Sequence, residues 1–148
     1  VPYGEIRDID ATQPTLTYNR IGRHMARMAK TRISSVLSPW LTNVQLGDVH
    51  QIAISHGEGR FVASEADIQQ MIANGQIATQ YVDDEGKPSG DIRYNPNGSD
   101  YAVEAITSPD GRILGKMGHS ERIGTHLYLN IPLEKDQRLF EAGVNYFK

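Results

Sequence analysis

Two strand-like segments, residues 101–106 and 112–117, are joined by a turn that restricts how this part of the chain can fold. The turn is Ser108-Pro109-Asp110-Gly111, in which the proline fixes its own φ and the glycine tolerates a positive φ. This arrangement predicts an antiparallel hairpin. The hairpin leads directly into Gly118-His119-Ser120-Glu121-Arg122, so a histidine and a carboxylate are expected in a loop at a strand end.

The other elements follow from apolar spacing and from turn-forming residues. A serine N-cap and a glycine stop bound residues 64–74, which are expected to form a helix. Its apolar face is expected to be Ile68, Met71 and Ile72, and that of a C-terminal helix to be Leu139, Phe140, Gly143, Val144 and Phe147. Strands are expected after an extended leading segment, at residues 23–35, 51–55, 61–63 and 77–82. No repeat or linker divides the chain, so residues 1–148 are expected to form a single domain.

The composition excludes several classes of function. The chain has no cysteine, so it contains no disulfide, no thiolate zinc site and no cysteine nucleophile. A net charge of -3 argues against binding nucleic acid through net charge. The five histidines lack the spacing of metal ligands, so no metal site is expected. No apolar stretch approaches the roughly 20 residues of a membrane span. A cytoplasmic protein with no membrane partner is therefore expected.

Two loops carry candidate chemistry. His119 and Glu121 lie two residues apart, and a histidine beside a carboxylate is the base-and-orienter half of a nucleophilic triad. In residues 55–61 (SHGEGRF), two glycines flank a charged residue at a strand end, which indicates close approach of the backbone to another group. Most such histidine–carboxylate pairs are surface charges, and the second loop equally fits a turn with solvated charges. The residues alone leave these alternatives open.

Taken together, three motifs resemble a known family. They are HGEGRF at residues 56–61, NPNGS at 95–99 and GHSER at 118–122. With the residues around them, they make nearly the whole chain similar to the glutamine amidotransferase domain of phosphoribosylformylglycinamidine synthase, an enzyme of purine biosynthesis. Their order and spacing are more specific than any one motif. The family often has a proline where this chain has Ser120, a departure that leaves His119 and Glu121 intact.

The resemblance implies a fold and a set of roles. The fold is the C-terminal portion of a flavodoxin-like α/β, class I amidotransferase domain, with a mixed sheet, a β-hairpin and flanking helices. In that chemistry a cysteine thiolate attacks the side-chain amide of glutamine. His119 matches the histidine that protonates the departing ammonia and then activates water, and Glu121 matches the glutamate that orients it. His56 and Glu58 match the segment that lines the glutamine pocket.

The resemblance also implies partners. The ammonia would pass to a synthetase domain of the same enzyme, which uses ATP and Mg²⁺ to convert phosphoribosylformylglycinamide to the amidine. No cofactor is expected in this chain, because none of the ATP machinery is visible in its sequence.

The cysteine of the triad has no counterpart in this sequence. In the family it lies in a GxCNGCQ-like stretch that precedes a segment resembling residues 1–6 (VPYGEI), so the thiol is expected just upstream of Val1. The chain is then expected to be the C-terminal part of a domain that lacks its N-terminal half. On this interpretation the isolated chain has no glutaminase activity, and unpaired strand edges make it marginally stable or self-associating.

Two other functions are compatible with the sequence. One is another class I amidotransferase, such as a guanylate or cytidylate synthetase type, against which HGEGRF and NPNGS argue. The other is a non-catalytic interaction module that kept the fold and lost the nucleophile. A cysteine elbow encoded upstream would favour an enzyme, and a different residue there would favour the module.

Overall fold

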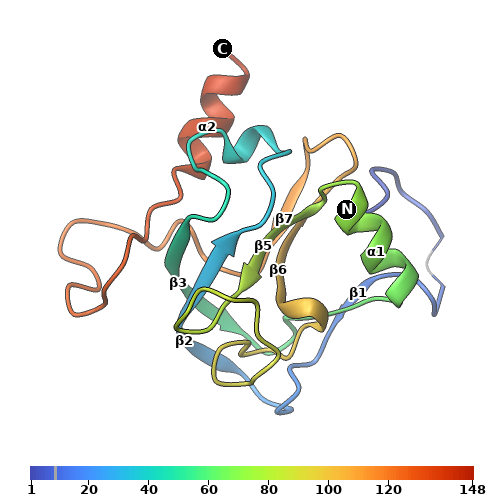
Figure 1. Cartoon of the computed structure of the whole chain (residues 1–148), viewed down its shortest axis with the longest axis horizontal. Helices are drawn as coiled ribbons and strands as arrows, with labels where there is room; N and C mark the ends of the chain where they lie inside the picture. The colour runs from blue at the N-terminus through green and yellow to red at the C-terminus, as the bar shows by residue number, and fades with distance from the viewer. Residues whose placement is uncertain (9) are drawn as a thin grey trace.

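A five-stranded sheet forms the centre of the molecule in the computed structural model, which describes residues 1–8 and 10–148 (Figure 1). The elements in chain order are β1 Thr15–Thr17, β2 Met25–Ile33, η1 Pro39–Leu41, β3 Val49–His56, β4 Arg60–Val62, α1 Glu65–Ala73, β5 Ile77–Tyr81, η2 Asp100–Ala102, β6 Val103–Thr107, β7 Leu114–Lys116 and α2 Leu139–Tyr146. The strand order is β3-β2-β5-β6-β7, and β1 pairs with β4 in a separate small sheet. The pairings between these strands are antiparallel, and a parallel bridge joins His50 to Glu134.

The sheet curls until its two edges meet. β3 and β7 are the edge strands of the sheet order, yet the backbone N–H of His119, three residues after β7, donates to the carbonyl of Ala53 on β3 at 2.8 Å. Further along, the N–H of Gln51 donates to the carbonyl of Glu134 at 2.8 Å. The edge of β3 is therefore occupied at these two positions, where the sequence predicted unpaired strand edges. The same closure fixes where the His119 loop lies.

The predicted hairpin is confirmed. β6 and β7 pair antiparallel, with Ala105 opposite Lys116, and the turn contains Gly111 at a φ of 75°. Both strands are shorter than predicted, and β6 starts late because Tyr101 and Ala102 have positive φ values of 51° and 56° in η2 and cannot continue a strand. β6 consequently begins at Val103 and the hairpin delivers the His119 loop directly after Lys116.

The helix predicted over residues 64–74 is also confirmed. The Ser64 hydroxyl caps it by accepting a hydrogen bond from the N–H of Asp67 at 3.1 Å. Ile68 and Met71 are buried in one core cluster with Phe61, Ile77 and Val103. The prediction for Ile72 was wrong, because its side chain is 47% exposed. The short helix contacts the core through one row of residues, and Ile72 lies beside that row.

The C-terminal helix is α2, and its apolar stripe differs from the prediction. Leu139, Ala142 and Gly143 are its buried residues, and Leu139 joins a second core cluster with Leu41 of η1. The other three predicted members are exposed, namely Phe140 at 58%, Val144 at 57% and Phe147 at 74%. The helix packs on η1 along one side only, so a single narrow row is covered. Figure 1 shows α2 projecting beyond the sheet toward the C-terminus.

Candidate functional site

His119 and Glu121 contact each other directly. The Nδ1 atom of His119 lies 2.7 Å from Oε1 of Glu121. A carboxylate can only accept a hydrogen bond, so Nδ1 carries the hydrogen and donates it. The other ring nitrogen, Nε2, is then the one that can take up or release a proton toward a substrate. This is the geometry expected of a base and the group that orients it.

The charge of Glu121 is favoured by its surroundings. Its own backbone N–H, then the His119 imidazole and the nearby Arg122 guanidinium, lower the pKa of this carboxyl below its ordinary value, although burial opposes them. The Arg122 Nε lies 3.8 Å from the same Oε1 atom. The Glu121 side chain is 55% exposed and that of His119 is 28% exposed. Glu121 is therefore ionised at neutral pH and available to orient the imidazole.

The pair lines a pocket of about 500 Å³ at the end of β7. Trp40 of η1 and Phe140 of α2 contribute aromatic surface to it, and polar side chains come from the His119 loop and from Arg112 and Lys116. A mostly apolar hollow with a few convergent polar groups is the usual form of a small-molecule site. The His119 pocket, as we call it, is large enough for a reacting side-chain amide to approach the imidazole.

Hydrogen bonds to buried polar groups hold the HGEGRF loop in place. The His56 Nδ1 donates to Oδ1 of Asn19 at 3.1 Å, and the side-chain amide of Asn19 donates to the His56 carbonyl at 2.7 Å. Burial lowers the pKa of His56, and the charges of His24 and His119 add to this effect. Gly59 has to be glycine, because a Cβ there would come within 2.5 Å of the His56 ring.

The NPNGS loop anchors the same region. The Asn97 side-chain amide donates to the carbonyl of Gly59 at 2.6 Å, and the Ser99 hydroxyl accepts from the N–H of Phe61 at 3.0 Å. Asn97 is fully buried and Ser99 is 4% exposed. The two motifs are therefore neighbours in space, although the partners of each hydrogen bond are 38 positions apart in the sequence.

The structure joins two of the four predicted site residues and separates the other two. His119 and Glu121 share the His119 pocket, whereas His56 and Glu58 are absent from the residues described as lining it. His56 is buried and Glu58 is exposed. Asn19, whose side-chain amide donates to the His56 carbonyl and so holds the HGEGRF loop, was not predicted as a site residue. Its position in a turn-rich segment before Gly22 gave only a weak signal.

Two further kinds of feature, a metal-ligand cluster and a membrane-spanning helix, are absent from the described residues. Within residues 1–8 and 10–148, no group of three or more histidine, aspartate or glutamate side chains is arranged to hold a metal ion. The helices in that part of the chain are all too short or too polar to cross a membrane.

The fold and the site together define a class of protein: an α/β domain that presents a histidine–carboxylate pair at a strand end, as nucleophilic acyl-transfer enzymes do. The family model described as the CobB/CobQ-like glutamine amidotransferase domain matches residues 1–147. The chain therefore belongs to this family, and the resemblance drawn from its motifs is confirmed.

Two individual proteins similar to this chain share a single name. The chain is 28% identical over 131 residues to phosphoribosylformylglycinamidine synthase subunit PurQ of Methanosarcina mazei, covering 88% of this chain and 54% of the relative. It is 30% identical over 109 residues to subunit PurQ of Aquifex aeolicus, covering 70% and 47%. The solved structure of PurLQS from Thermotoga maritima shares the fold, with a TM-score of 0.68, 24% identity, and coverage of 92% of this chain and 54% of that chain. The chain thus spans about half the length of the relatives it matches.

Proposed function

We propose that this chain is the part of a glutaminase that carries the acid–base histidine and its orienting glutamate, and that it supplies ammonia to a phosphoribosylformylglycinamidine synthase. The observation that carries the proposal is the 2.7 Å contact between His119 Nδ1 and Glu121 Oε1 at the edge of a pocket. It occurs in a chain of the glutamine amidotransferase family, and its similar proteins are named as subunits of that synthase.

The proposed reaction uses His119 as a proton carrier. The imidazole takes the proton of a thiol, and the resulting thiolate sulfur attacks the side-chain carbonyl carbon of glutamine. His119 returns that proton to the nitrogen as the C–N bond breaks, which releases ammonia and leaves a thioester. It then takes a proton from water, whose oxygen attacks the thioester carbon. The C–S bond breaks, glutamate leaves and the thiolate is restored.

The thiol in this scheme has to come from outside the 148 residues, because they include no cysteine. Glu121 occupies the Nδ1 atom of His119, which leaves Nε2 for the thiol, and the imidazole lines the His119 pocket. Glu121 stabilises the imidazolium that forms twice in each cycle. His56 and Glu58 are proposed as glutamine contacts made in the complete site, where the HGEGRF loop supplies one wall.

The ammonia is proposed to serve a synthetase partner in the cytoplasm. That partner would bind ATP and Mg²⁺, activate the formyl amide oxygen of phosphoribosylformylglycinamide and let ammonia displace it to give the amidine. The described residues of this chain do not fit a Mg²⁺ site, since they hold no cluster of suitable ligands. No step of the synthetase reaction is therefore assigned to this chain.

The test is a comparison of nitrogen sources in the full-length protein, assembled with its synthetase. His119→Ala should abolish glutamate release and glutamine-dependent amidine formation, while free ammonia still supports amidine formation. His126→Asn is the matched control, because His126 lies in the same stretch and is exposed. Retention of glutamine use by His119→Ala would refute the proposal. A protein that releases no glutamate at all would favour a non-catalytic interaction module instead.

A further inference from the structure

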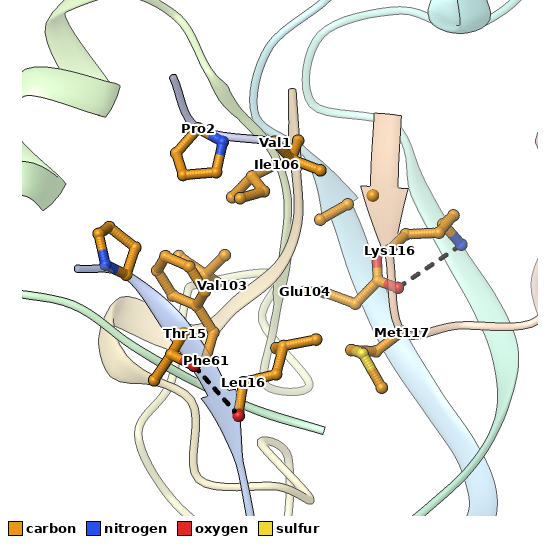
Figure 2. A pocket seen from close by; sticks show the side chains of 13 residues that line it. Val1, Pro2, Thr15, Leu16, Phe61, Val103, Glu104, Ile106, Lys116 and Met117 are labelled. Atoms are coloured by element: carbon orange, nitrogen blue, oxygen red, sulfur yellow. Dashed lines mark hydrogen bonds and ion pairs between the residues drawn. The ribbon is translucent and has the colours of Figure 1, made fainter. Parts of the chain in front are cut away.

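A buried ion pair lies directly beneath the His119 loop. The Glu104 side chain on β6 is 0% exposed and the Lys116 side chain on β7 is 13% exposed, with Nζ 3.5 Å from Oε1. Figure 2 shows the two side chains facing each other across the strands. The second carboxylate oxygen accepts a hydrogen bond from the Thr79 hydroxyl on β5. Glu104 is thus paired on both oxygens, as a buried carboxylate requires.

The ion pair holds the backbone on the N-terminal side of His119. The N–H of Gly118 donates to Oε1 of Glu104 at 2.5 Å, and the Lys116 ammonium donates to the Gly118 carbonyl at 3.0 Å. Gly118 fits because it has no side chain, since a Cβ there would lie 2.9 Å from Oε1 of Glu104. The peptide group before His119 is therefore fixed by both charges.

The same network holds the residue on the other side of His119. The Lys116 ammonium also donates to the Ser120 hydroxyl at 2.9 Å, and that hydroxyl donates to Oε1 of Gln137 at 2.8 Å. Ser120 is 6% exposed and Gln137 is fully buried. The N–H of His119 itself donates to the carbonyl of Ala53. Every residue from 118 to 120 is consequently held by a hydrogen bond, while the side chains of His119 and Glu121 remain free to face the pocket.

Stability alone does not account for such a network. A buried ion pair often stabilises a fold no better than well-packed apolar residues of similar volume, because both charges lose their hydration. The contacts of the Lys116 ammonium go to Glu104 and to the two residues that flank His119. The hydrogen bonds of this ammonium therefore go to the His119 loop rather than to the surrounding core.

We propose that Glu104, Lys116 and Ser120 are positioning residues for glutamine hydrolysis: the buried ion pair and the serine fix the backbone on both sides of His119, so that its imidazole meets Glu121 and faces the His119 pocket. This proposal rests on the proposed function. Displacing a catalytic group by about 1 Å can cost roughly 100-fold in rate. The network prevents such a displacement through hydrogen bonds to the backbone and to Gln137, although Lys116 and Ser120 also line the His119 pocket.

The test uses three changes in the full-length protein with its synthetase. Ser120→Ala removes the link to Gln137 and keeps the ion pair. Lys116→Met removes all three ammonium contacts and leaves the buried charge of Glu104 without its cation, so it also risks unfolding. The double variant Glu104→Gln with Lys116→Met removes both charges together and avoids that risk. The matched control is Lys30→Met with Asp84→Asn, which removes an ion pair of 2.6 Å from the surface end of the sheet.

Two measurements separate positioning from a merely structural role. The first is the steady-state rate with glutamine, in which we expect kcat to fall roughly 10- to 100-fold for Ser120→Ala and the double variant. The KM for glutamine and the ammonia-dependent rate should stay within about 3-fold, since the synthetase and the proposed glutamine contacts His56 and Glu58 are unchanged. The second is the ¹⁵N spectrum of the His119 ring, which should change from the Nδ1–H form to a mixture of tautomers. The control variant, Lys30→Met with Asp84→Asn, should leave the glutamine-dependent kcat and the ring spectrum unchanged.

Each possible outcome supports or overturns the positioning role of the network. Unchanged kcat and unchanged ring signals in folded Ser120→Ala and in the double variant would overturn the positioning role. An equal loss of glutamine- and ammonia-dependent rates would also overturn it, because it would show general damage to the fold. If the unmodified protein hydrolyses no glutamine, the proposed function fails, and the ring spectrum alone then supports or refutes the positioning of His119.

Discussion

The Glu121 carboxylate contacts His119 at 2.7 Å while its own side chain remains 55% exposed to solvent. An exposed pair of this kind contributes little to folding, typically less than about 1 kcal/mol. We therefore expect Glu121→Ala to leave the thermal midpoint nearly unchanged. The expected effect is on catalysis: glutamine-dependent turnover should fall roughly 10- to 100-fold, because the imidazole loses its fixed orientation.

The measurement for Glu121 is glutamate release by the full-length variant, set beside the larger loss expected for His119→Ala. Glu85→Ala is a suitable control, since Glu85 is exposed and pairs with Lys87 in a distant turn. A Glu121→Ala enzyme as inactive as His119→Ala would show that the carboxylate does more than orient the ring.

Local sequence signals predicted α1 and the hairpin that leads into the site. The helix over residues 64–74 depended on its serine cap and glycine stop, and the hairpin depended on residues 108–111, so neither needed information from the rest of the chain. His119 and Glu121 were predicted for the same reason: they are two residues apart, and their contact is local. Relationships of this kind can be read from the order of residues.

The features that could not be predicted from the sequence depend on contacts between segments that are distant along the chain. The curl that brings His119 to Ala53 is set by the register of five strands, and no pattern within one strand specifies it. The exposure of Phe140 and Val144 likewise depends on how much of α2 the rest of the fold covers. The pairing of Glu104 with Lys116 was missed because each residue by itself resembles an ordinary charged residue in a strand.

Gly118→Ala should destabilise the fold. Its Cβ would come within 2.9 Å of the Glu104 carboxylate, 3.0 Å of Cγ2 of Ile52 and 3.2 Å of the Lys116 ammonium. Because buried groups surround it, we expect a loss of about 1–3 kcal/mol in the free energy of unfolding, measured by urea denaturation. Gly90→Ala is the control, since no atom lies within 4 Å of the added carbon. Equal stability of the two variants would contradict the close packing seen at Gly118.

Gly143→Ala should loosen α2 from η1. The new Cβ would lie 2.4 Å from Cζ3 of Trp40, so either the indole or the helix has to move. Trp40 is the single tryptophan of the chain, and tryptophan fluorescence therefore reports on the surroundings of this one indole. We expect a red-shifted emission maximum and a loss of about 1–3 kcal/mol in stability. Val144→Ala, at a side chain 57% exposed on the same helix, should change neither.

Stability should fall as the pH drops below neutrality, because two histidines are buried. Burial lowers the pKa of both His50 and His56 from the ordinary value of 6.5. As the pH falls through about 6.5, the unfolded chain binds protons that the folded chain does not, and folding free energy is lost. The contribution is fully present above this pH, and each histidine can add at most about 1.4 kcal/mol per pH unit to the slope.

The His56 part of this slope can be isolated by His56→Asn. The asparagine amide can replace the Nδ1 donor to Asn19, whereas the His56 Nε2 that it removes has no partner among the described residues. Urea unfolding at pH 7.5 and pH 5.5 should show a smaller difference for the variant than for the unmodified chain. The exposed His126 provides the control through His126→Asn. A variant that keeps the full difference would mean that the imidazole of His56 takes up its proton without opening the loop, and that the pH response comes from His50.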